Sequence, residues 1–312
     1  MSEDSVIITC ALTGGYHDKR ANANLPEQPD EIVAAGVAAW RAGAAVLHIH
    51  ARDARGHNTM DKDIYRTLHE RLCAETDAIV QLTTGGGLAY STDERLATAL
   101  LSPEMCSLNM GNVLFLKDGH EMMLANPRSE IARFAEEMLR RGVKPELEVY
   151  NDTMLDEIDV LLERGLLSEP LNVSLVLGTP SQGGARASWQ NLTELARKVP
   201  PGANTTVIAM ARSQLPLTTM GLAMGLNIRV GMEDNVRFNR DELVRDNAQL
   251  VERAVRIARE LGREPASAAQ AREVIGTRGR RPGYPPDPVL ASEEPLTARV
   301  PVRDFAPGEF RP

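Results

Sequence analysis

The chain has 312 residues and a formal net charge of -8, from 35 Lys and Arg against 43 Asp and Glu. This acidic balance argues against a nucleic-acid surface, which requires a basic patch. The three cysteines include no CxxC pair, and no segment shows a secretory pattern or an apolar run long enough to cross a bilayer. We therefore expect a cytoplasmic protein.

Short apolar, β-branched runs alternate with helical patterns along most of the chain. The runs predict strands at residues 6–12, 45–50, 78–83, 105–109, 146–150, 171–177, 205–210 and 227–231. Apolar residues spaced i, i+3 and i+4 predict helices at residues 29–42, 127–141, 152–165, 188–198 and 241–261.

Eight strand–helix units predict an α/β fold of the (β/α)8 type, a TIM barrel with a C-terminal extension. A doubly wound open sheet is the alternative, but Gly85-Gly86-Gly87 lacks the GxGxxG spacing of a dinucleotide site. We assign residues 1–276, which end in a short helix at 266–276, to the barrel domain. Residues 277–312 are rich in proline, glycine and charge, and they predict an extended or partly disordered tail.

Two histidines, His48 and His50, end the second predicted strand and lie two positions apart. Residues i and i+2 of a strand share a face, so the two imidazoles are expected side by side, as metal ligands would be. In a TIM barrel the active groups gather at the C-terminal ends of the strands. Glu233, after the eighth strand, would complete a site of two His and one carboxylate with an open position, the catalytic pattern. The alternative is a pair of hydrogen-bonded barrel histidines.

Further polar residues end other predicted strands. Asp234 beside Arg229 suggests a general base whose position and pKa the guanidinium fixes, or else a structural ion pair. Arg229 could instead clamp a substrate carboxylate. Glu148 is too costly to bury alone, so it either pairs with an Arg or His or turns outward. Thr83 and the Gly85-Gly86 backbone could bind an anion, or could simply form a tight turn.

A series of strings in the chain points to a known family. In chain order they are Asn24-Leu25-Pro26, GAAVLHIHAR at 43–52, Thr84-Gly85-Gly86, PEMCSLN at 103–109, PELEVY at 145–150, LVLG at 175–178, IRVGMEDN at 228–235, NAQL at 247–250 and AQAREV at 269–274. Over residues 5–276 the chain resembles the β-keto acid cleavage enzymes, whose best-known member acts on 3-keto-5-aminohexanoate.

This resemblance implies a zinc-dependent (β/α)8 transferase, usually a homotetramer. Such an enzyme condenses a β-keto acid with acetyl-CoA and releases acetoacetate and a new acyl-CoA. By position, His48, His50 and Glu233 are then the zinc ligands.

The resemblance also assigns the other polar residues. Arg229 and Asp234 match the pair that deprotonates the keto acid, and Glu148 matches a buried acidic residue of the site. The contacts to the substrate carboxylate or carbonyl fall on Thr83, Gly86 and Ser107.

One position departs from the members that act on an amine-bearing substrate. These place a carboxylate just after the first strand, where this chain has Tyr16, followed by His17. A tyrosine can make a cation–π contact with a quaternary ammonium or form the wall of an apolar pocket. We therefore do not expect the amino-hexanoate as substrate. Met122 and Met123 are interpreted as core or interface packing.

Two other functions compete with this one. A metal-dependent hydrolase of the amidohydrolase type would carry HxH on its first strand and further histidines later, yet no histidine follows His120. A non-catalytic barrel that binds a partner would have no need of the metal triad together with Arg229 and Asp234.

Overall fold

The computed structural model describes residues 5–86, 90–117, 120–277 and 279. Eight parallel strands form a closed barrel, in which the last strand along the chain pairs with the first. All eight were predicted, and their ends differ from the prediction by at most two residues. The strands are β2 (Ile8–Ala11), β3 (Val46–Ile49), β6 (Ile79–Leu82), β7 (Met105–Asn109), β10 (Lys144–Val149), β11 (Asn172–Leu177), β13 (Asn204–Ala209) and β14 (Asn227–Val230).

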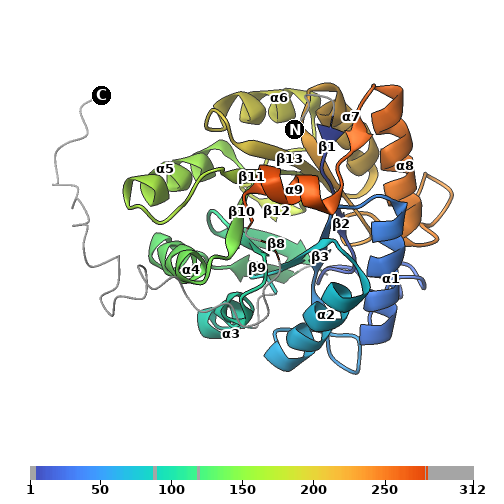
Figure 1. Cartoon of the computed structure of the whole chain (residues 1–312), viewed down its shortest axis with the longest axis horizontal. Coiled ribbons are helices and arrows are strands. Elements are labelled where there is room, and N and C mark those ends of the chain that lie inside the picture. The colour runs from blue at the N-terminus through green and yellow to red at the C-terminus, as the bar shows by residue number, and fades with distance from the viewer. Residues whose placement is uncertain (1–4, 87–89, 118–119, 278, 280–312) are drawn as a thin grey trace.

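Helices surround the strands, so the expected TIM barrel is confirmed (Figure 1). They are α1 (Pro29–Ala42), α2 (Lys62–Glu75), α3 (Thr92–Leu96), α4 (Arg128–Arg141), α5 (Leu155–Glu163), α6 (Trp189–Lys198), α7 (Gln214–Ala223), α8 (Asn247–Glu260) and α9 (Ala268–Ile275). The helix predicted from residue 241 begins later, at Asn247, because the carboxylate of Asp246 caps it by accepting from the backbone N–H of Gln249.

Helix α9 closes one end of the barrel. In Figure 1 it lies across the centre of the strands, on the side that faces the viewer. Its apolar residues Ala271 and Ile275 pack against side chains at the starts of the strands, among them Val46, Ile79 and Met105. Helix α9 therefore covers the end at which the strands begin, where the amides of Asn172 and Asn204 also donate to its backbone carbonyls. The polar residues that end the strands lie at the opposite end.

Short strands add three smaller sheets. Strands β1 (Ser5–Val6) and β15 (Glu264–Pro265) pair, as do β4 (Ala51–Arg52) and β5 (Asn58–Thr59). A hairpin of β8 (Val113–Lys117) and β9 (His120–Leu124) forms a sheet with β12 (Ser181–Gln182). The sequence analysis did not predict this hairpin, which follows the end of barrel strand β7.

The expected C-terminal tail and the expected cytoplasmic location both stay predictions. The tail assigned to residues 277–312 lies outside the described residues except for Thr277 and Gly279. None of the helices in the described ranges combines the length and the apolar character needed to span a membrane.

Barrel closure depends on Gly231, which follows β14. Its φ of +136° lies in the region that favours glycine, and an added Cβ would lie 2.1 Å from the carbonyl oxygen of Ala11 on β2. The tight approach brings the next residues over the end of β2, where the Glu233 N–H donates to Ala11 O at 3.2 Å. A residue with a Cβ at position 231 would separate the two strands.

We expect Gly231→Ala to lower the free energy of unfolding by about 3 kcal/mol or more, because backbone strain and a clash with fixed backbone atoms add up. Urea denaturation measures this loss. Gly142→Ala is the matched control: Gly142 has a φ of +66° at the end of α4, with no atom within 4 Å of the added Cβ. That change should cost only about 1 kcal/mol. Equal losses in the two variants would show that close packing at Gly231 is not needed.

Candidate active site

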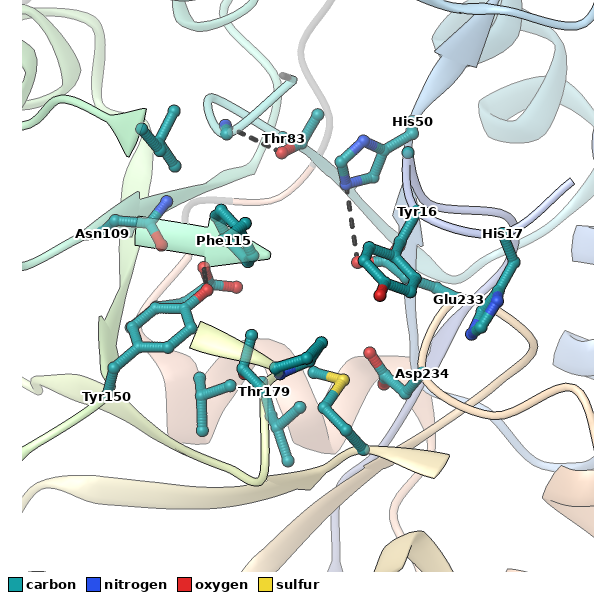
Figure 2. Close-up of a pocket in the computed structure, with 18 of the residues that line it drawn as sticks. Tyr16, His17, His50, Thr83, Asn109, Phe115, Tyr150, Thr179, Glu233 and Asp234 are labelled. Atoms are coloured by element: carbon teal, nitrogen blue, oxygen red, sulfur yellow. Dashed lines mark hydrogen bonds and ion pairs between the residues drawn. The ribbon is translucent and has the colours of Figure 1, made fainter. Parts of the chain in front are cut away.

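The polar ends of the barrel strands surround a cavity of about 610 Å³. In Figure 2, His50, Tyr16, Glu233 and Asp234 face it from one side, and Asn109 and Tyr150 face it from the other. These residues come from segments far apart in the sequence. The barrel brings them together because all its strands run in the same direction, as the sequence analysis assumed.

His48, His50 and Glu233 come together as predicted. The Nε2 atoms of His48 and His50 lie 3.6 and 3.5 Å from Oε1 of Glu233. One ligand atom from each of the three residues lies within 4.8 Å of the other two, a spacing at which all three could reach a single metal ion. The two histidines are buried, and Glu233 borders the cavity.

The surroundings of these residues fit a metal ion. His48 Nδ1 lies 2.6 Å from Oε1 of Gln81, an acceptor only, so Nδ1 carries the proton and Nε2 presents its lone pair. Burial lowers the pKa of His48 to about 3, so the ring is neutral, as a ligand must be. Among the described residues, the buried Oε2 of Glu233 has no hydrogen-bond partner. Gly14 leaves room for the Glu233 side chain, since a Cβ at position 14 would lie 2.4 Å from Cγ of Glu233.

Arg229 lies at the centre of the charged groups. It donates Nε–H and Nη2–H to the two oxygens of Asp234, at 2.9 and 2.7 Å. Nη2 also donates to Glu233, and Nη1 donates to Glu148 at 3.5 Å. One buried guanidinium therefore contacts three carboxylates, and Glu148 is paired with an arginine rather than turned outward.

The four groups differ in their protonation. Burial raises the pKa of Glu148 to about 8 and that of Asp234 to about 6, although Arg229 opposes both shifts. Burial would also raise the pKa of Glu233, but Arg229 and the two histidines outweigh it and hold this pKa well below its usual range. The carboxylates likewise hold the pKa of Arg229 well above its usual value, against the effect of burial. Glu233 is thus the most firmly ionised carboxylate, as suits a metal ligand.

Three residues, Thr83, Gly86 and Ser107, were predicted to contact the substrate carboxylate or carbonyl. Thr83 lines the cavity, and its Oγ1 accepts from the Gly85 N–H at 2.9 Å. Ser107 lies behind it, with Oγ 3.5 Å from the Thr83 hydroxyl. Gly86 is not among the cavity-lining residues that the structure describes; its carbonyl accepts from Asn58. Contact of Ser107 and Gly86 with the substrate therefore stays a prediction.

Tyr16 lines the cavity and is 40% exposed. Its ring packs edge-on against that of His17, with centroids 5.2 Å apart. Tyr16 therefore borders the cavity, and its contact with the substrate stays a prediction.

Asn247 holds the segments on which Glu233 and Gly14 lie. This first residue of α8 donates its Nδ2–H to Leu12 O at 3.0 Å and accepts from the Met232 N–H at 2.9 Å. It thereby ties the end of β2 to the end of β14.

Sequence reasoning missed several residues of this site. Gln81 is a buried polar residue in an otherwise apolar strand, and this contrast is a signal that could have identified it. Asn109 was recognised only as a polar residue that ends a predicted strand; it lines the cavity, and its Oδ1 has no partner among the described residues. Phe115 and Met122 line the cavity from the hairpin, so the interpretation of Met122 as core or interface packing was wrong. Nothing in their local pattern indicated this position.

Comparison with known proteins identifies relatives of the whole barrel domain. The chain is 36% identical over 274 residues to the 3-keto-5-aminohexanoate cleavage enzyme of Acetoanaerobium sticklandii, covering 88% of this chain and 98% of that one. It is 31% identical over 300 residues to the 3,5-dioxohexanoate:acetyl-CoA acetone transferase of Paraburkholderia graminis, covering 88% and 96%.

The fold also matches that of solved structures. The apo structure of ObcA superposes with a TM-score of 0.70 at 22% identity, over 81% of this chain and 66% of that longer chain. The model of the beta-keto acid cleavage enzyme family matches residues 5–277. The chain therefore belongs to the beta-keto acid cleavage enzyme family, as its strand-end residues indicated.

Proposed function

We propose that this enzyme is zinc-dependent and transfers the acyl part of a β-keto acid to CoA, with acetyl-CoA as co-substrate and acetoacetate as the second product. The observation that carries the proposal is the convergence of a three-residue metal-ligand set and the Arg229–Asp234 pair on one cavity. The acetyl-CoA transferase name of the Paraburkholderia graminis relative supports the co-substrate.

The ligands of the zinc ion would be His48, His50 and Glu233, which leave the cavity side open to a substrate oxygen. A bound zinc ion would supply Lewis-acid polarisation of the keto carbonyl, which acidifies the carbon between the keto and carboxylate groups. Thr83 and the N–H groups of the following turn would bind the substrate carboxylate.

Asp234 would take the proton from that carbon, since it borders the cavity and Arg229 holds both of its oxygens in place. The resulting carbanion attacks the thioester carbonyl of acetyl-CoA, and CoA thiolate leaves. The thiolate then attacks the original keto carbon. Cleavage of the bond to the neighbouring carbon releases the new acyl-CoA, and acetoacetate regains the proton. Atoms and charge balance without an external oxidant or reductant.

Features of the structure weigh against the hydrolase alternative. His48 lies on β3, the second barrel strand, and His50 directly follows that strand, whereas the alternative requires the pair on the first strand. The homotetramer implied by the resemblance and the cytoplasmic location stay predictions, and light scattering of the purified protein tests the first.

Zinc binding tests the metal assignment without an activity assay. We expect His48→Ala and Glu233→Gln to abolish stoichiometric zinc binding. Gln81→Leu should weaken it about 10- to 100-fold, because His48 then loses the acceptor that orients its ring. Competition with a chromophoric chelator measures these affinities. His57→Ala is the control, since the His57 side chain is 74% exposed. Full zinc affinity in both ligand variants would refute the site.

The proton-transfer role predicts a separate phenotype for Asp234→Asn. We expect kcat for acetoacetate formation to fall about 10²- to 10⁴-fold, since the amide cannot accept the proton. Zinc content should be unchanged, because Asp234 is not one of the ligands. Asp63→Asn on the outer helix α2, where the side chain is 69% exposed, serves as control. Activity within a few-fold of the unmodified enzyme would exclude Asp234 as the proton acceptor.

A further inference from the structure

The chemistry of the cavity walls defines the part of the substrate beyond its keto carbon. We propose that this enzyme takes β-keto acids whose tail is uncharged and apolar, and that the tail packs against the inner face of the β8–β9 hairpin. The inference rests on the proposed function, because it assumes that the cavity binds the β-keto acid.

No carboxylate is available to a cationic tail among the described residues that line the cavity. These residues include three carboxylates, those of Glu148, Glu233 and Asp234, and each contacts the Arg229 guanidinium. An ammonium or trimethylammonium group would leave water without a counter-ion, and burying an unpaired charge is strongly unfavourable.

Binding of a substrate with an anionic tail is also unfavourable in this cavity. Arg229 is the sole Lys or Arg among the described residues that line the cavity, and all of its donor nitrogens already contact carboxylates. A second substrate carboxylate would have to displace one of these contacts and leave the displaced carboxylate unpaired. The cavity therefore selects against charge of either sign at the tail.

The hairpin supplies a wall suited to an apolar tail. Phe115 on β8 lies directly opposite Met122 on β9, and residues opposite each other in an antiparallel pair share a face. Both line the cavity, as does Leu124, two residues after Met122 on the same face. Figure 2 shows Phe115 directed into the cavity.

The barrel strands continue this apolar wall. The other aliphatic and thioether side chains that line the cavity are those of Val176, Ile208 and Met210, at or just after the ends of β11 and β13, together with Pro180 and Ala211. An alkyl tail that packs among these groups and the hairpin gains free energy from each CH₂ that leaves water, whereas a charged end group would lose its hydration there without a partner.

The aromatic residues also fit an apolar tail. The chain has five Phe, five Tyr and two Trp, and Tyr16, Tyr90, Phe115 and Tyr150 line the cavity. The Tyr90 hydroxyl donates to Asn58 O at 2.9 Å, and that of Tyr150 lies 3.5 Å from Glu148. Because these hydroxyls have partners in the protein, the rings present mainly carbon surface.

The Asn109 amide, whose Nδ2–H groups can donate to a carboxylate, belongs to the other end of the substrate. A Cβ added at Gly85 would lie 3.1 Å from Asn109 Nδ2, so this amide borders the turn that follows Thr83. It would therefore face the substrate carboxylate rather than the tail.

A matched panel of 3-oxo acids tests the inference on the unmodified zinc-loaded enzyme. The members share one chain length and end in methyl, ammonium, trimethylammonium or carboxylate; acetoacetate formation with acetyl-CoA is measured. We expect kcat/KM for the methyl-ended acid to exceed that of every charged member at least 100-fold. A charged member equal to or better than the methyl-ended acid would overturn the inference and leave the proposed function standing. No product from any member would overturn both.

Two adjacent methionines provide a matched pair of variants. Met122 lines the cavity, whereas Met123 points to the other face of the hairpin and is 54% exposed. Met122→Glu places a carboxylate in the wall, so the ratio of kcat/KM for the ammonium-ended to the methyl-ended acid should rise at least 10-fold. Met123→Glu should leave this ratio within about 2-fold. Equal ratios in both variants would exclude contact between the tail and the hairpin, and the substrate panel remains decisive if Met122→Glu does not fold.

Discussion

A single buried guanidinium determines the arrangement of the whole site. Arg229 contacts Glu148 on β10 and both Glu233 and Asp234 after β14, so it sets together the positions of the proposed metal ligand and of the proposed proton acceptor. Burying charges is tolerated only when they are paired and hydrogen-bonded, and here one cation pairs with three carboxyl groups. These carboxyl groups differ in pKa because burial raises the pKa of Glu148 and Asp234, whereas Arg229 and the two histidines outweigh burial at Glu233.

Much of the fold and part of the site follow from local patterns. The strands alternate with helices and are mostly short apolar, β-branched runs, and this pattern predicted all eight barrel strands. His48 and His50 could be paired because strand geometry alone places them on one face. Glu233 could be added because barrel closure brings the last strand beside the first. These inferences rest on periodicity and topology, both of which a sequence encodes directly.

The rest depends on contacts between segments that no local pattern relates. Gln81 meets His48 because the two lie opposite each other on neighbouring strands, and this pairing requires the register. The hairpin carries one apolar face into the cavity and exposes the other, and only the three-dimensional position of β8 and β9 tells Met122 from Met123. The predicted helix began at residue 241, before the observed start of α8, because apolar residues at helical spacing also precede the capping residue Asp246.

The separation between the barrel sheet and the hairpin sheet has a consequence for how such an enzyme diversifies. Strand β8 pairs with β9 on one side and with β12 on the other, and neither hairpin strand belongs to the closed barrel. The proposed catalytic groups lie on the barrel, whose closure tolerates little change at positions such as Gly231. Substitutions on the hairpin therefore alter what the cavity admits without loosening the scaffold. New substrate ranges can evolve there, or be engineered there, while the reaction chemistry is inherited intact.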